Sequence, residues 1–113
     1  MKGAVAFAAG LQGLAVGGVD LQGDLVRFKI DVPAGRHAGE TWLVGVAVPA
    51  DFPDVPPGGP HVSPPLHHPH GAVHPSTFGA DWIYWSRPIP NWAKDPTVRA
   101  YLRHIYTLFA QIA

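Results

Sequence analysis

The density of proline in the middle of the chain limits its fold more than any other feature. Nine of the 13 prolines lie between Pro49 and Pro75. Because proline fixes φ and lacks a backbone donor, neither a regular helix nor a long central strand can run through this segment. Residues 61–63 can add a short edge strand. The rest is expected to be an ordered, extended loop anchored by scattered apolar side chains.

The residues before this segment predict strands. Residues 25–32 alternate apolar with charged side chains, which is the pattern of a half-buried strand. Residues 41–48 are apolar on both faces, as in a more central strand of the same sheet. Residues 14–21 form a weaker strand candidate. We therefore expect an antiparallel meander of three to four strands.

The residues after the proline-rich segment predict one amphipathic helix. Asp95 is a candidate N-cap, and Pro96 suits the first helical position. The apolar residues that follow recur every three or four positions: Val98, Tyr101, Leu102, Ile105, Phe109 and Ile112. A helix with this stripe should lie across the sheet, giving a single α+β domain over residues 1–113.

Composition excludes several classes of function. The eight basic side chains equal the eight acidic ones and form no stripe, so we expect no nucleic-acid binding. Glycines interrupt the apolar residues 3–18, and no run approaches the roughly 20 apolar residues of a membrane span. We interpret this N-terminal stretch as folded structure rather than a secretory signal.

The chain has no cysteine, which excludes disulfides, thiolate nucleophiles and cysteine-ligated metal centres. The hydroxyls near the readable motifs are Ser76, Thr77 and Ser86. A serine reacts well only when a base activates it, and His74 or His70 could serve. In the alternative interpretation Ser86 bonds the backbone and has no chemical role.

Five of the seven histidines lie in one segment: His61, His67, His68, His70 and His74. The spacing of His68, His70 and His74 could supply three imidazoles to zinc, nickel or copper. The alternative is that these loop histidines are solvated or bonded to the backbone. No carboxylate stands among them, and Asp81 is the closest acid after them.

Four aromatic residues lie within eleven positions: Trp82, Tyr84, Trp85 and Trp92. Protein interfaces favour Trp, Tyr and Arg, so these residues and Arg87 are candidate binding residues. The alternative is a small core beneath a loop. We expect Trp85 and Trp92 to be core residues, Trp82 to be more exposed, and Arg87 to fix the loop.

These motifs together resemble the ubiquitin-conjugating-enzyme superfamily. Phe52-Pro53 followed by Pro56-Pro57 resembles its tyrosine-proline and double-proline segment, and His74-Pro75-Ser76 resembles its His-Pro-Asn motif. Gly79 and Trp92 stand near the superfamily's glycine and tryptophan around the active-site loop. Residues 82–87 read Trp-Ile-Tyr-Trp-Ser-Arg, which resembles the tryptophan-rich motif of the prokaryotic family E.

The chain also departs from these patterns. The catalytic cysteine of the superfamily would fall near Trp82, and Pro88 replaces the histidine that ends the family motif. Ser76 replaces the asparagine that supports the oxyanion in the ordinary enzyme. The helices that usually precede and follow the core have no evident counterpart, so we expect a minimal ubiquitin-conjugating-like fold.

The resemblance implies a non-thioester binding or scaffold protein of a bacterial ubiquitin-like modification pathway, acting in the cytoplasm. Its expected partner is a ubiquitin-like protein or an activating-enzyme-like subunit, engaged through residues 61–92; a homodimer through the aromatic residues is a further alternative. Two other functions stay open. One is an oxyester-forming conjugating enzyme that uses Ser86, Ser76 or His74. The other is a zinc- or nickel-dependent module built on residues 61–74.

Overall fold

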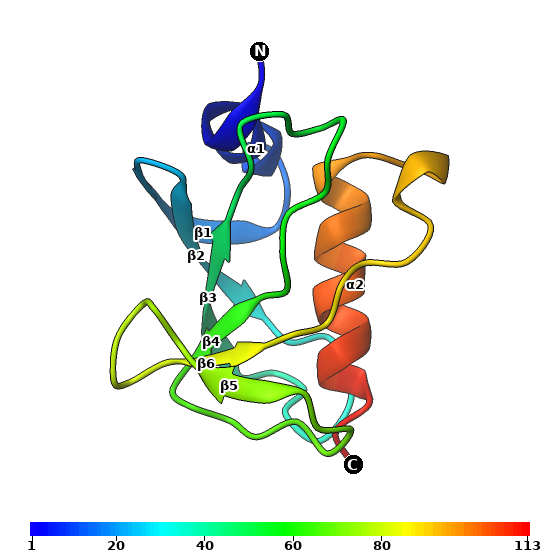
Figure 1. Ribbon diagram of the computed structural model, residues 1–113. Helices are drawn as coiled ribbons and strands as arrows, with labels where there is room; N and C mark the ends of the chain where they lie inside the picture. Colours follow the sequence, from blue (N-terminus) through cyan, green and yellow to red (C-terminus); the bar gives the residue numbers. More distant parts are fainter.

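A computed structural model describes all residues from 1 to 113 as one α+β domain (Figure 1). The elements, in chain order, are α1 (Gly3–Leu11), β1 (Val16–Gln22), β2 (Leu25–Asp31), β3 (Thr41–Ala47), β4 (His61–Ser63), β5 (Val73–Pro75), β6 (Ile83–Trp85), the 3₁₀ turn η1 (Trp92–Lys94) and α2 (Val98–Ala110). The expected α+β class and the C-terminal helix are confirmed, but the sheet has six strands rather than three or four.

The six strands follow the order β1-β2-β3-β4-β6-β5, and every neighbouring pair is antiparallel. β4 lies between β3 and β6, so the prediction of an edge strand at residues 61–63 was wrong. Pro60 and Pro64 stand just outside this three-residue strand, where neither removes a donor from its ladder. The proline-rich segment therefore passes through the middle of the sheet, and β5 forms the edge.

β2 confirms the alternation in its sequence. Val26, Phe28 and Ile30 are buried, whereas Lys29 and Asp31 are exposed. β3 pairs with β2 along its whole length and occupies an inner position, as expected. Its second apolar face is not buried throughout, however, because Leu43 remains 36% exposed. The sheet therefore has one face in the core and one partly open face.

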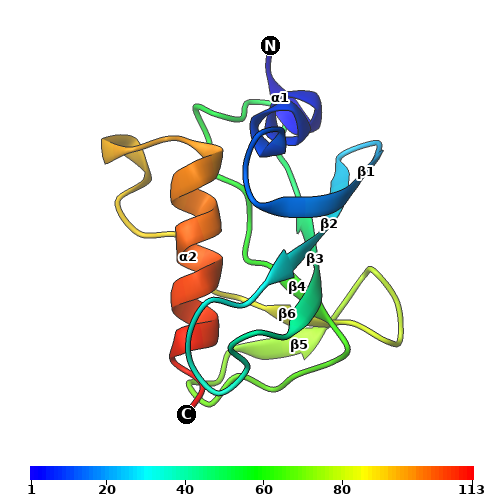
Figure 2. The ribbon, with the colours of Figure 1, turned by 180° about the vertical axis from the view of Figure 1, so that it is seen from behind.

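α2 covers the core face of the sheet, as both sides of the molecule show (Figures 1 and 2). The members of its predicted stripe from Val98 to Phe109 are buried, and Leu108 joins them. Ile112, predicted on the same helix, is buried but lies beyond the end of α2. The predicted cap was wrong: Thr97 is the N-cap, and its hydroxyl accepts the backbone N–H of Ala100 at 3.1 Å. Asp95 instead accepts hydrogen bonds from Thr97 and Arg103 at 3.0 and 2.7 Å.

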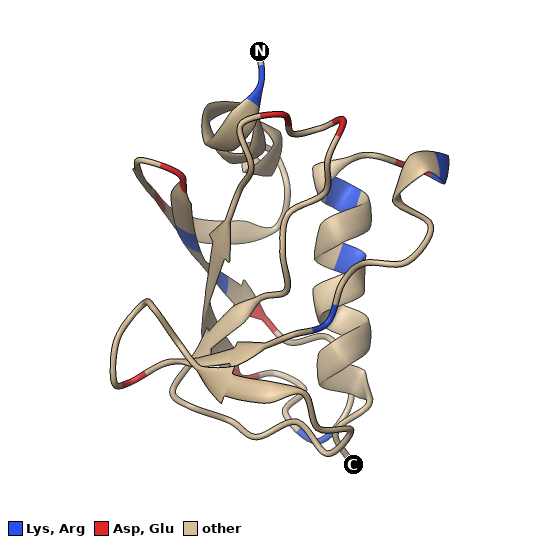
Figure 3. Ribbon diagram, in the orientation of Figure 1, with Lys and Arg blue, Asp and Glu red and all other residues tan.

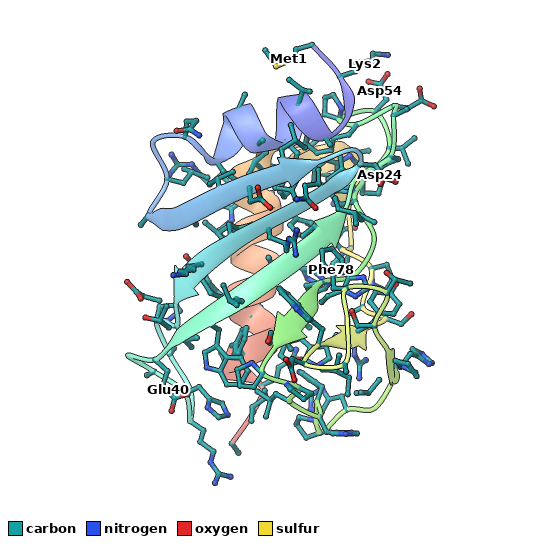
Figure 4. The ribbon with its side chains drawn as sticks, turned by 90° about the vertical axis from the view of Figure 1, so that its left-hand side faces the viewer. Met1, Lys2, Asp24, Glu40, Asp54 and Phe78 are labelled. Carbon is teal, nitrogen blue, oxygen red and sulfur yellow. The ribbon has the colours of Figure 1, made fainter.

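α1 corrects the expectation that no helix precedes the core, and it lies alongside β1 (Figure 4). Phe7 is fully buried, with its ring 5.5 Å from Phe52 and 5.7 Å from Tyr101 of α2. Gly10 permits this packing, because a Cβ there would stand 2.4 Å from a methyl group of Val98. The N-terminal stretch is thus part of the core.

Charged residues are scattered along the chain and gather into no basic stripe (Figure 3). Neither helix combines the length and apolar character that crossing a bilayer requires. The ion pairs of Lys and Arg join exposed side chains, such as Arg103 with Asp95 at 2.7 Å, whereas His37, beside Glu40, is only 16% exposed. Stability therefore comes mainly from the apolar core, since exposed pairs contribute about 0–1 kcal/mol each.

Candidate functional site

Residues 76–82 connect β5 to β6 and fold over the open face of the sheet; we call them the aromatic loop. Phe78 lies in front of the sheet while α2 lies behind it (Figure 4). Its ring occupies the space above Gly45 of β3, where an added Cβ would stand 2.6 Å from the ring. The missing side chain at position 45 therefore gives the loop its seat.

Ser76 begins the aromatic loop and is bonded to β4. Its Oγ lies 2.7 Å from Nδ1 of His61, and it accepts the backbone N–H of Phe78 at 2.9 Å. The His61 ring is buried between Tyr84 and Phe78, with both ring centroids 4.5 Å away. Burial lowers the pKa of His61 to about 4, because the charged imidazolium loses its water. His61 is therefore neutral at pH 7.

A second side chain of β4 holds the far end of the loop. The Ser63 hydroxyl donates to the carbonyl of Asp81 at 2.7 Å. Trp82 then packs its ring 5.2 Å from Phe78. Because side chains alternate along a strand, His61 and Ser63 project from the same face of β4. They fix both ends of the aromatic loop on the open face.

A surface hollow of about 580 Å³ opens where the aromatic loop meets the edge strand β5. Its lining residues are His67, Val73, His74, Pro75, Ser76, Gly79, Ala80, Trp82 and Ile83. This volume is in the range of ligand pockets. A larger hollow of about 640 Å³ lies near the end of α2 and contains none of the aromatic candidates. The hollow of about 580 Å³ is thus the candidate site, because Trp82 and Ser76 both line it.

The structure divides the predicted aromatic binding residues into two groups. Trp85 and Trp92 are core residues, as expected, and their indole N–H groups donate to Leu66 and Pro53 carbonyls, each at 2.7 Å. Their burial removes them from the binding face. Trp82 is half-buried at the rim of the hollow, and Tyr84 is half-buried beneath the loop, against His61.

Arg87 and Ser86 fix the chain after β6. Nη2 of Arg87 donates to the carbonyl of Gly71 at 2.9 Å, which confirms that this side chain anchors a loop. The backbone N–H of Ser86 donates to the carbonyl of Ala72 at 2.8 Å. Ser86 lines neither of the two hollows. The structure thus distinguishes Ser86 from Ser76, which opens onto the candidate site.

The histidines of the predicted metal site have separate surroundings. His68 is buried. Its Nε2 donates to the carbonyl of Leu108 at 2.9 Å, and its Nδ1 accepts the backbone N–H of His70 at 3.2 Å. His74 lies exposed on β5 with its ring 6.1 Å from Tyr84. No three His, Cys, Asp or Glu side chains are grouped to hold a metal ion. To become a ligand through Nδ1, His68 would have to give up the hydrogen bond that this nitrogen accepts from His70.

The histidine beside Ser76 is His61, which is neither of the two histidines that the sequence suggested as a base. Neither His74 nor His70 bonds a serine side chain, whereas His61 does so across 15 residues of sequence. The β4-β6-β5 order brings these two positions together. The alternation of side chains along β4 was one signal in the sequence. Because Val62 is buried in the core, His61 and Ser63 have to lie on the opposite face of the strand.

Comparisons with protein-family models, curated proteins and solved structures gave no match to this chain. The resemblance to ubiquitin-conjugating-like proteins therefore stays a prediction from the motifs. The fold and the geometry of the aromatic loop have to carry any functional argument.

Proposed function

We propose that this chain is a ubiquitin-conjugating-like protein that binds a partner of a bacterial ubiquitin-like pathway without thioester chemistry. The proposal draws on the resemblance and on the composition, because the chain has no thiol to carry an acyl group. Trp82 stands near the position at which the resemblance would place the catalytic cysteine. A tryptophan at this position can contact a partner, whereas it cannot carry an acyl group as a thioester.

The observation that carries the proposal is the Trp82 ring at the rim of the hollow, packed on Phe78. Tryptophan contributes strongly to binding energy when it sits at a desolvated interface centre. The loop that holds Trp82 is fixed at both ends by His61 and Ser63. A preformed surface loses little conformational entropy on binding, which favours affinity.

The position of the hollow suits an extended segment of the partner. β5 is the edge strand of the sheet, and Val73, His74 and Pro75 all line the hollow. An extended chain can align with a sheet edge through backbone hydrogen bonds, although Pro75 offers no donor. The proposed partner is accordingly a ubiquitin-like protein that presents a flexible tail, with an activating-enzyme-like subunit as the alternative.

The test is a titration of ¹⁵N-labelled protein with a bacterial ubiquitin-like protein that presents a flexible tail. We expect chemical-shift changes at residues 73–83 and at least a tenfold weaker affinity for Trp82→Ala, as for an interface hot spot. Leu21→Ala is the matched control, because Leu21 is 39% exposed on β1, at the opposite edge of the sheet. Wild-type affinity in Trp82→Ala, or shifts confined to other residues, would contradict the proposal.

A further inference from the structure

We infer that Ser76 and His61 form a nucleophile–base pair that accepts an acyl group from an activated ester at the hollow. The inference rests on the local geometry and does not depend on which protein partner binds. It gives this chain a covalent reaction through oxygen in place of sulfur. It also assigns to His61 the role of base that the sequence had suggested for His74 or His70.

The contacts of the Ser76 hydroxyl suit a nucleophile. Its Oγ lies 2.7 Å from Nδ1 of His61, within the reach that proton transfer requires. In the tautomer with its proton on Nε2, His61 accepts the serine proton at Nδ1. The backbone N–H of Phe78 points at the same oxygen from 2.9 Å. This donor stabilises the negative charge that develops on Oγ as the proton leaves.

The surroundings of His61 keep its lone pair available. The ring is held by β4 and by the rings of Tyr84 and Phe78, which fix its orientation as a third polar group does in other sites. No carboxylate bonds to it. Arg27, in the same cross-strand row as Gly45, is occupied by Asp20 and Gln22. Burial therefore governs its protonation and leaves it neutral.

The substrate side of the pair is open. Ser76 lines the hollow together with Gly79, Ala80 and Trp82, so an acyl group held in the hollow lies next to this residue. The backbone N–H groups of Thr77, Gly79 and Ala80 donate no hydrogen bond within the protein. Free N–H groups beside a nucleophile are the type of donor that stabilises an acyl oxyanion.

The reaction is an acyl transfer to oxygen. Ser76 Oγ forms a bond to the carbonyl carbon of the ester while its proton passes to Nδ1 of His61. The bond from that carbon to the alcohol oxygen then breaks, and the departing oxygen takes the proton from His61. The products are an ester on Ser76, the released alcohol and a neutral His61, so no oxidant or further reactant is needed.

The experiment treats the intact protein with p-nitrophenyl acetate and maps acetylated peptides by mass spectrometry over time. The covalent adduct is the measurement, because exposed histidines also release p-nitrophenol from this ester. In the wild-type protein we expect acetylation of Ser76 about 100-fold faster than of Ser86, near the lower end of what a positioned base contributes. This comparison within one folded protein requires no variant.

Two variants complete the test. His61→Gln is expected to lower the acetylation rate of Ser76 about 100-fold, whereas His70→Gln, at an exposed position outside this hollow, leaves it unchanged. Equal rates at Ser76 and Ser86, or an unchanged rate in His61→Gln, would overturn the inference. Acetylation of Ser76 by a small ester tests only the Ser76–His61 pair. A negative acetylation result therefore does not bear on partner binding, and a negative titration does not bear on acetylation of Ser76.

Discussion

Gly45 of β3 makes room for Phe78, and this one missing side chain determines where the aromatic loop can lie. A Cβ at position 45 would stand 2.6, 2.8 and 2.9 Å from three atoms of the Phe78 ring. Real side-chain carbons do not approach so closely, so the ring would have to move. The ring is also packed against His61, and moving it would disturb the bond to Ser76.

Gly45→Ala is therefore expected to destabilise the protein by about 1–3 kcal/mol and to displace the aromatic loop. Urea unfolding measures the first effect, and the chemical shifts of residues 76–82 measure the second. Gly17→Ala is the control, because Gly17 has nothing within 4 Å of the position where a Cβ would be added. Equal stability of the two variants would contradict the close packing at position 45.

His61 should make stability depend on acid. Its pKa is lowered to about 4 in the fold, against about 6.5 when unfolded. The unfolded chain therefore binds the proton first, and stability falls as the pH drops from about 6.5 to about 4, by up to roughly 3 kcal/mol. Burial also lowers the pKa of His68 and of His104, which adds in the same direction.

Unfolding measured between pH 7 and pH 4 checks this effect in the wild type and in His61→Gln. The variant should lose less stability over that interval, because it has no buried imidazole to protonate at position 61. Leu21→Ala is the control and should keep the wild-type slope, because it changes an exposed, uncharged side chain. A wild-type slope in His61→Gln would contradict the assignment.

At the scale of elements, long periodic segments could be predicted, whereas of the three-residue strands only β4 was expected, and at the wrong place in the sheet. The alternation over seven residues of β2 and the stripe along α2 identify both elements from the sequence. β5 and β6 have three residues each, too few for any period to show. α1 contains glycine and no clear polar face, so its helical form is explained by packing against its neighbours.

The cap of α2 shows the limit of local rules. Asp95 and Pro96 satisfy the usual signals, yet the hydroxyl of Thr97 is the group that reaches the Ala100 N–H. Thr97→Ala is expected to cost about 1 kcal/mol in urea unfolding. Asp95→Ala should cost less, because its pair with Arg103 is exposed on both sides. The reverse order of the two losses would support the cap predicted from sequence.

Across the whole molecule, aromatic side chains join the separate layers. The ring of Phe7 in α1 lies 6.3 Å from Phe28 of β2 and 5.7 Å from Tyr101 of α2. At the other end of the core, Phe109 of α2 packs between Trp42 and Trp85. The N-terminal helix is consequently expected to unfold together with the sheet rather than before it.

Phe7→Ala should destabilise the protein by about 3–5 kcal/mol, as for a large aromatic removed from a core. Val5→Ala is the control in the same helix, because Val5 is 56% exposed and should cost within about 0.5 kcal/mol. Thermal unfolding of both variants provides the measurement. A small loss in Phe7→Ala would mean that α1 contributes little to the core.

The candidate site was only partly predictable from sequence, because the arrangement of the whole sheet brings its residues together. The motifs named Ser76 and Trp82 as candidates, and the expected difference between the buried Trp85 and Trp92 and the half-buried Trp82 is confirmed. The partner of Ser76 depends on the strand order, which places β4 beside β6 and β5. Three-residue strands between prolines give no sequence pattern from which this order could be derived.

Nuclear Overhauser effects between the Phe78 ring and the α-protons of Gly45 test most directly whether the aromatic loop is held on the sheet. The Phe78 ring lies in contact range of Gly45 and is held there by its packing on His61. Strong cross-peaks are therefore expected from the ring to both α-protons of Gly45. Absence of both cross-peaks, with shifts for residues 76–82 typical of an unstructured chain, would contradict the preformed site and the two functions proposed for it.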